Sequence, residues 1–274
     1  MSGWLEAPAP AKLNLALLVG PLRPDGKHEV MTILERLSLA DTVRLRRAET
    51  TTVHGYPDDT LVAAALEAIG AAAGTSVRFE ARIEKRIPVA AGLGGGSSDA
   101  ATALRLANQL LEEPLSPDEL HTCAAAVGSD VSFFLCEGLQ LATGDGTTLT
   151  PVTLPRDYAV LLALREGDAK DSTRAVYEAF DARGGADGFS DRRRALEVAL
   201  AQVEEAADLA ALPRNDLASS PLAALLEERG AIRADVTGAG PIVYGLFTDH
   251  AAAERAATGL RGVSSTWIAT PDGA

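Results

Sequence analysis

Residues 88–101, with the sequence PVAAGLGGGSSDAA, form the most informative stretch of the chain. Four glycines and two serines lie within residues 92–98, and an alanine-rich apolar run follows. Glycine lets the backbone turn sharply and approach a ligand closely, because it has no Cβ. A helix that begins directly after such a loop points unpaired N–H groups and a partial positive charge into it. The stretch therefore predicts a phosphate-binding loop and a protein that uses a nucleotide.

The two most common phosphate-binding motifs do not fit this stretch. A dinucleotide-binding loop needs a third spaced glycine, and Ser97 stands at that position. No acidic residue stands about 20 residues further on at the end of a second parallel strand, where that motif places one. The segment contains no GxxxxGK followed by Ser or Thr. The remaining alternative is a glycine-rich connection without a ligand, in which the serines only cap a helix.

The composition excludes several classes of protein. The chain has 274 residues, of which 47% are hydrophobic, and its net charge is −13. An acidic chain is poorly suited to nucleic acid or an anionic membrane, so we expect neither as a partner. Cys123 and Cys136 are too few and too dispersed for a metal site or a disulfide framework. The N-terminus lacks a signal-peptide pattern and no run is long enough to span a membrane, which predicts a cytoplasmic location.

The pattern of apolar residues predicts a mixture of helices and strands. Alternation in residues 11–19 predicts a strand with Lys12 and Asn14 on one face. Residues 37–47 predict a second strand, interrupted near Asp41, and residues 192–207 predict a charged amphipathic helix. We expect an α+β protein with a boundary near residue 153, so that the predicted domains are 1–153 and 154–274.

Three smaller patterns have a functional and a structural interpretation. Asp130, in a Gly-Ser-Asp sequence, could accept a proton from a hydroxyl group or could cap the next turn. Lys12 could face a phosphate as a point charge, or it could lie on an ordinary solvated strand face. Residues 237–241, TGAGP, form a turn between two predicted strands and carry no function by themselves. The histidines are scattered without the spacing of metal ligands.

Together and in this order, these segments resemble the three motifs of one kinase superfamily. Residues 9–15 (APAKLNL), the glycine loop and residues 237–241 are similar to those of the galactokinase, homoserine kinase, mevalonate kinase and phosphomevalonate kinase superfamily. Within it, the chain most resembles the 4-diphosphocytidyl-2-C-methyl-D-erythritol kinases of the non-mevalonate isoprenoid pathway. The segments RPDGKHE at 23–29 and NDL at 215–217 support this resemblance.

The resemblance implies a fold and an activity. The N-terminal half would resemble ribosomal protein S5 domain 2, with a left-handed βαβ feature, and the C-terminal half would be ferredoxin-like. The activity would be the ATP-dependent phosphorylation of the 2-hydroxyl of a cytidine-diphosphate substrate. Alternatives are a sister kinase that acts on a homoserine- or mevalonate-like alcohol, and a nucleotide-binding protein without catalysis. Partners would be ATP and the small-molecule substrate, and the chain would be a monomer or a weak homodimer.

The resemblance also implies residue roles. Asp130 would orient or deprotonate the hydroxyl, and Lys12 would keep Asp130 ionised and offset charge at the γ-phosphate. The residues that would bind ATP with Mg²⁺ are Pro88, Gly92, Leu93, Gly94, Gly95, Gly96, Ser97 and Ser98, with Ser97 or Ser98 as the candidate metal contact. The residues that would bind the substrate are Asn14, Lys27, His28, Tyr177, Gly238, Ala239 and Gly240. His28 would read the cytosine edge and Tyr177 would stack on the ring, whereas Lys27 replaces the tyrosine that is usual in the family.

Overall fold

The computed structural model describes residues 3–56, 60–165 and 172–273, and its contacts divide them into two compact units. Unit 1 comprises residues up to 11, 39–89 and 94–137, and unit 2 comprises residues 12–38, 90–93 and 138–274. The division falls within the two long strands β1 (Leu5–Leu22) and β2 (His28–Ala48), which pair with each other. The boundary between residues 153 and 154 stays a prediction. In the described part of the chain, no helix is both long and apolar enough to cross a membrane.

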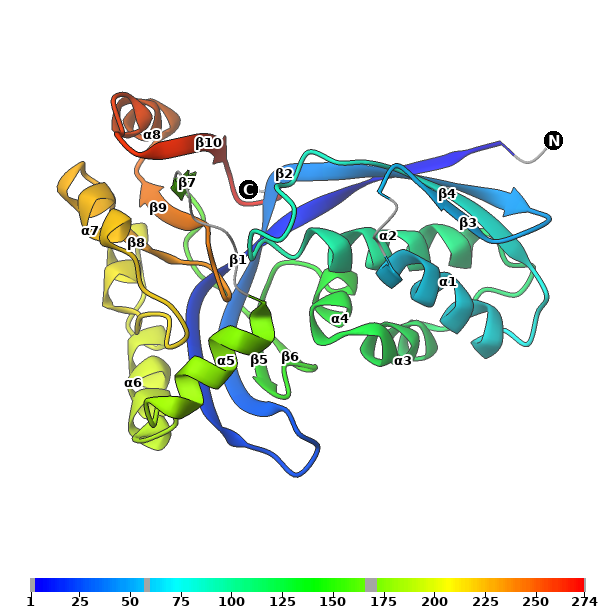
Figure 1. Cartoon of the computed structure of the whole chain (residues 1–274), viewed down its shortest axis with the longest axis horizontal. Coiled ribbons are helices and arrows are strands. Elements are labelled where there is room, and N and C mark those ends of the chain that lie inside the picture. The colour runs from blue at the N-terminus through cyan, green and yellow to red at the C-terminus, as the bar shows by residue number, and fades with distance from the viewer. Residues whose placement is uncertain (1–2, 57–59, 166–171, 274) are drawn as a thin grey trace. The chain divides into compact units, whose positions relative to one another are not determined.

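Unit 1 contains a βαβ segment and a group of four helices (Figure 1). Its further elements are β3 (Thr52–His54), α1 (Thr60–Ala72), β4 (Arg78–Glu84), α2 (Gly95–Leu110), α3 (Pro117–Val127) and α4 (Ser129–Leu135). β4 pairs antiparallel with β2 and parallel with β3, and α1 connects β3 to β4. The buried face of α2 is rich in alanine, which allows close packing against α1 and α4.

Unit 2 contains a four-stranded antiparallel sheet in the order β10-β7-β9-β8. Its further elements are β5 (Leu139–Gly144), β6 (Thr148–Val152), β7 (Ala159–Arg165), α5 (Thr173–Ala182), α6 (Phe189–Leu200), the 3₁₀ helix η1 (Ala206–Ala211), α7 (Pro221–Glu228), β8 (Arg233–Val236), β9 (Val243–Phe247), α8 (His250–Ala257) and β10 (Val263–Ala269). Numbered within this sheet, the order is 4-1-3-2, as in a ferredoxin-like fold. α7 and α8 pack on it through a common apolar core (Figure 1). The predicted α+β class and the ferredoxin-like half are confirmed.

Two sequence-based element boundaries are wrong. β2 runs without interruption through Asp41, because the carboxylate of this buried residue is paired inside unit 1 and does not need solvent. The helix predicted over 192–207 begins earlier and ends at Leu200. η1 then begins separately, since Asp208 accepts hydrogen bonds from the backbone N–H groups of Glu204 and Glu205.

Candidate active site

Lys12 and Asn14 lie side by side on a buried face of β1, within unit 2. Each is 5% exposed, which excludes an ordinary solvated strand face. Lys12 Nζ donates to Asn14 Oδ1 at 2.5 Å, and Asn14 Nδ2 donates to Thr32 Oγ1 at 2.8 Å. Thr32 in turn donates to a backbone carbonyl of β1 at 2.7 Å. The ammonium is therefore held in one position by a chain of buried hydrogen bonds.

The turn at residues 237–240 lies against this face. Asn14 N donates to Thr237 Oγ1 at 3.2 Å, over a sequence separation of 223 residues. Gly238 and Gly240 have φ values of 57° and 76°, in the left-handed region that favours glycine. A Cβ on Gly238 would lie 3.2 Å from Lys12 Nζ, so the backbone of this turn approaches the ammonium closely. The turn and the strand face, predicted as separate features, form one cluster.

The beginning of the glycine loop joins the same cluster. Lys12 N donates to Leu93 O at 2.9 Å. Gly92 has a φ of 80°, and a Cβ there would lie only 2.5 Å from the carbonyl oxygen of Thr237. Ala90 also has a positive φ, of 55°, which is strained for a residue with a side chain. Unit 2 by itself thus brings together parts of all three motifs that carry the resemblance.

The rest of the glycine loop passes into unit 1 and starts α2. Gly94, with a φ of 68°, precedes the helix and no side chain caps it, so the alternative of serines that only cap the helix is wrong. The first N–H groups of a helix have no carbonyl partner within it. Ser98 Oγ is buried and has no hydrogen-bond partner among the described residues. A phosphate oxygen would accept hydrogen bonds from both kinds of group, and the hydroxyl oxygen could instead be a ligand of a phosphate-bound cation, so the loop fits a nucleotide phosphate.

An ionic cluster lies next to the start of α2 and consists of the buried carboxylates Asp41 and Asp99 and the partly buried Lys85. Lys85 Nζ is 2.5 Å from Asp41 Oδ2 and 2.7 Å from Asp99 Oδ2. Asp41 Oδ1 also accepts the backbone N–H of Ile87, at 2.8 Å. Burial lowers the pKa of Lys85, but the carboxylates of Asp99 and Asp41 outweigh it and the net shift is upward. The charge of Asp99, which lies in the first turns of the phosphate-loop helix, is thus offset by the ammonium of Lys85.

Asp130 lies in the first turn of α4, in unit 1, and is half-buried. α4 packs against α2, which begins at the glycine loop. Lys12 belongs to unit 2, and the pairing of Asp130 with Lys12 therefore stays a prediction. The described residues contain no cluster of three or more His, Cys, Asp or Glu side chains that could hold a metal ion.

The predicted substrate residues all lie in unit 2. His28 and Tyr177 contact each other, with ring centroids 5.0 Å apart. A base between two rings needs about 7 Å, so cytosine would have to use the other face of Tyr177. His28 Nδ1 lies 2.9 Å from Gly20 O, which can only accept, so this nitrogen carries the hydrogen. Tyr177 and Ala239 pack on one apolar cluster, which links the ring pair to the glycine turn.

Lys27 lies in the turn before β2 and forms an ion pair. Its Nζ is 2.6 Å from Asp145 Oδ2, in the turn between β5 and β6. Hydrogen bonds from Lys27 and Thr147 lower the pKa of Asp145 to about 2. The lysine that replaces the usual tyrosine is therefore engaged with a carboxylate of its own chain.

Comparisons with known proteins show to which family the chain is related. The model of the GHMP kinases N terminal domain matches residues 60–138, and that of the GHMP kinases C terminal matches residues 196–264. A 4-diphosphocytidyl-2-C-methyl-D-erythritol kinase from Gloeobacter violaceus is 37% identical over 93% of this chain and 89% of the relative. The chain belongs to this kinase family. The resemblance inferred from its motifs is confirmed, and the protein is a small-molecule kinase.

Solved structures of the family have the same fold. A crystal structure of 4-(cytidine 5'-diphospho)-2C-methyl-D-erythritol kinase matches with a TM-score of 0.76 and 30% identity, over 97% of this chain and 98% of that one. The Methanococcus jannaschii mevalonate kinase also matches with a TM-score of 0.76, over 99% and 98%, but at 13% identity, which shows the fold alone.

Sequence reasoning missed several residues around the site of this kinase. Thr32 and Lys85 stand in ordinary strand and loop sequence, and no local pattern distinguishes them. Thr237 is part of a motif, but its contact with Asn14 depends on the tertiary fold. Asn215 belongs to a segment that supports the resemblance, but nothing in that segment indicates what its side chain contacts.

Proposed function

We propose that this kinase transfers the γ-phosphoryl group of ATP to the 2-hydroxyl of 4-diphosphocytidyl-2-C-methyl-D-erythritol, in non-mevalonate isoprenoid biosynthesis. The observation that carries the proposal is the cluster of Lys12, Asn14 and the turn at 237–240, in a chain that matches kinases of this name over nearly its full length. The substrate residues predicted from the resemblance lie in the same unit. A cytoplasmic location and a monomeric or weakly dimeric state accompany the proposal as predictions.

In this reaction the hydroxyl oxygen of the substrate attacks the γ-phosphorus, and ADP leaves. Asp130 orients the hydroxyl and, as the base, accepts its proton. Lys12, held by Asn14, offsets the negative charge on the transferred group. The loop from Gly92 to Ser98 would bind the ATP phosphates, and Ser97 or Ser98 would help to hold Mg²⁺, which would offset the negative charge of these phosphates. Catalysis then depends mainly on positioning and electrostatic stabilisation.

Asp130→Ala tests the assignment of the base. We expect ADP release in the presence of both substrates to fall by about 100-fold or more, because the proton acceptor is lost. Asp118→Ala is a matched control, since Asp118 lies exposed in the first turn of α3 and should change the rate by less than about twofold. Retention of most activity in Asp130→Ala would overturn this assignment.

A further inference from the structure

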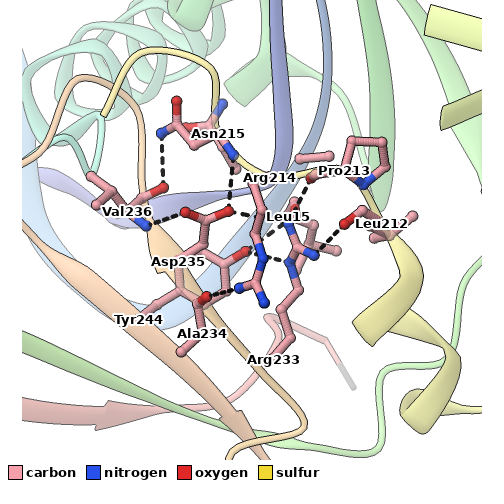
Figure 2. A network of polar contacts seen from close by, with 12 residues as sticks. Leu15, Leu212, Pro213, Arg214, Asn215, Arg233, Ala234, Asp235, Val236 and Tyr244 are labelled. Carbon is pink, nitrogen blue, oxygen red and sulfur yellow. Dashed lines mark hydrogen bonds and ion pairs between the residues drawn. The ribbon is translucent and has the colours of Figure 1, made fainter. Parts of the chain in front are cut away.

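A network of polar groups in unit 2 forms hydrogen bonds with the turn at 237–240 and with the residue before it (Figure 2). Asn215 is at its centre. Asn215 Nδ2 donates to Val236 O at 2.9 Å and to Gly238 O at 2.7 Å, so that one side-chain amide bridges the carbonyls on both sides of Thr237. Its Oδ1 accepts the backbone N–H of Leu217 at 2.8 Å. Every polar atom of this side chain is engaged.

The backbone of Asn215 is fixed by a second layer. Asn215 N donates to Asp235 Oδ2 at 2.9 Å, and Arg233 donates to the same oxygen at 3.2 Å. Figure 2 shows the guanidinium of Arg233 also turned toward Leu212 and Pro213, whose carbonyls it binds. Arg233 is fully buried. A buried cation that donates to two carbonyls and a carboxylate cannot move without leaving several polar groups unsatisfied.

The same network also forms hydrogen bonds with the backbone of β1, the strand that carries Lys12 and Asn14. Tyr244 accepts a hydrogen bond from Arg233 Nε at 3.1 Å and donates to Leu15 O at 3.1 Å. Asp216, next to Asn215, donates its N–H to Leu17 O at 2.9 Å and accepts the N–H of Val19 at 2.9 Å. Residues 215 and 216 thus connect the glycine turn to the edge of β1.

The position of the Gly238 carbonyl determines where the next N–H points. A trans peptide directs its C=O and N–H to opposite sides. Since Gly238 O points to Asn215, the N–H of Ala239 points away from it. In the part of the chain that the structure describes, the N–H groups of Gly238 and Ala239 have no acceptor. Successive free N–H groups beside a left-handed residue are typical of an anion-binding backbone concavity.

We propose that Asn215 is a positioning residue, which holds the Gly238 carbonyl so that the free N–H groups of Gly238 and Ala239 bind a phosphate oxygen of the bound substrates. The proposal rests on the proposed kinase function for the identity of that phosphate. Asn215 itself does not contact the substrates. It acts through the turn and through Asp216 on the strand of Lys12.

Asn215→Asp tests this role. The variant keeps the acceptor for Leu217 N–H but places a carboxylate oxygen against the carbonyls of Val236 and Gly238, so the turn should move. We expect kcat/KM to fall by about tenfold or more. A rise in KM for the alcohol alone places the phosphate on that substrate, and a rise for ATP alone places it on the nucleotide. Asn215→Ala removes the Nδ2 donor but places no carboxylate against the two carbonyls. Its kcat/KM should therefore fall less than that of Asn215→Asp.

Asn108→Asp is the matched control. Asn108 also donates through Nδ2 to a carbonyl, of Leu115 at 3.1 Å, and accepts the N–H of the same residue at 2.7 Å. It lies near the C-terminal end of α2, about 20 Å along the helix from Gly95. We expect Asn108→Asp to lower the melting temperature about as much as Asn215→Asp does. Its kcat and KM values should equal those of the wild type. Equal kinetic losses in Asn215→Asp and Asn108→Asp would overturn the proposal.

A second measurement does not depend on the reaction. Amide hydrogen exchange of a peptide covering residues 236–242 should be faster in both Asn215 variants than in the wild type and in Asn108→Asp. Unchanged exchange there would contradict the positioning role. If the wild type does not turn over the proposed substrate but the exchange result holds, the proposed function fails while the positioning of the turn stands.

Discussion

At the scale of single residues, the most unusual feature is the ion pair of Lys27 and Asp145. Lys27 is about half exposed, and its ammonium has a carboxylate partner within its own unit. A lysine in such a pair offers an aliphatic stem to a neighbouring ring but no free charge to a phosphate. A contact of Lys27 with the base, through this stem, stays a prediction.

Lys27→Ala should raise the pKa of Asp145 from about 2 toward its ordinary value of 3.8, because the largest cause of the lowered pKa is the hydrogen bond from Lys27. Since the folded-state pKa is lowered, the stability that this carboxylate contributes is present above pH 3.8 and is lost as the pH falls through about 2. An NMR titration of the side-chain carboxyl measures the shift.

Thr147→Val is the control for this titration, because it removes only the second hydrogen bond to Asp145 and should raise the pKa less. An Asp145 pKa that stays near 2 in Lys27→Ala would show that the ion pair is not formed in solution.

The residue scale also shows what local sequence can and cannot predict. The alternation in β1 predicted that Lys12 and Asn14 share a face, because a strand places every second residue on the same side. It could not predict that this face is buried, since burial comes from Thr32 on another strand and Thr237 more than two hundred residues away. The contacts of Asn215 and Lys85 could not be predicted either, because they depend on carbonyls and carboxylates that only the fold brings near.

At the scale of elements, the start of α2 combines an anion-binding loop with a carboxylate in its own first turns. Asp99 would weaken the attraction of the helix start for a phosphate if its charge were exposed there. In the structure it is buried and paired with Lys85, which also holds Asp41 in β2. The ionic cluster thus ties the loop, the helix and the strand of unit 1 together.

Lys85→Met should lower the free energy of unfolding by about 3–5 kcal/mol, because it leaves two buried carboxylates without their cation. The pKa of Lys85 is raised, so its contribution is present below its ordinary value of 10.5 and is lost as the pH rises through the folded-state value. In the variant this loss of stability at high pH should be absent, because the titrating ammonium is gone. Urea unfolding at several pH values measures both effects.

The control for the unfolding experiment is Lys27→Met. Lys27 is also a lysine in an ion pair, but it is exposed, and its loss should change the free energy of unfolding by less than about 1 kcal/mol. Equal losses in Lys85→Met and Lys27→Met would contradict the structural role of the buried cluster.

The start or end of a helix or strand was predictable only where the local sequence carries a signal for it. Ser116, Pro117 and Glu119 form a capping box with proline at the start of α3, and the helix begins where this pattern predicts. The end of α6 has no such pattern, because the residues after Leu200 keep helical propensity. Asp41 suggested a break in β2, and only its buried partners explain why the strand continues.

At the scale of the whole molecule, neither unit corresponds to one continuous stretch of the chain. The division passes through β1, β2 and the glycine loop, so composition along the sequence could not reveal it. The fold class was still predictable, since the order of helices and strands and the three motifs occur together in one superfamily. The choice of acceptor alcohol depends on a few side chains and not on the architecture, which a mevalonate kinase shares.

The measurement that tests the central claim most directly is ADP release by the purified protein with ATP, Mg²⁺ and one acceptor alcohol at a time. The acceptors are 4-diphosphocytidyl-2-C-methyl-D-erythritol, mevalonate and homoserine, with a reaction lacking acceptor as the baseline. We predict turnover with the first alcohol and baseline rates with the other two. Turnover with mevalonate or homoserine in place of the cytidyl substrate, or ATP binding without turnover of any alcohol, would contradict the claim.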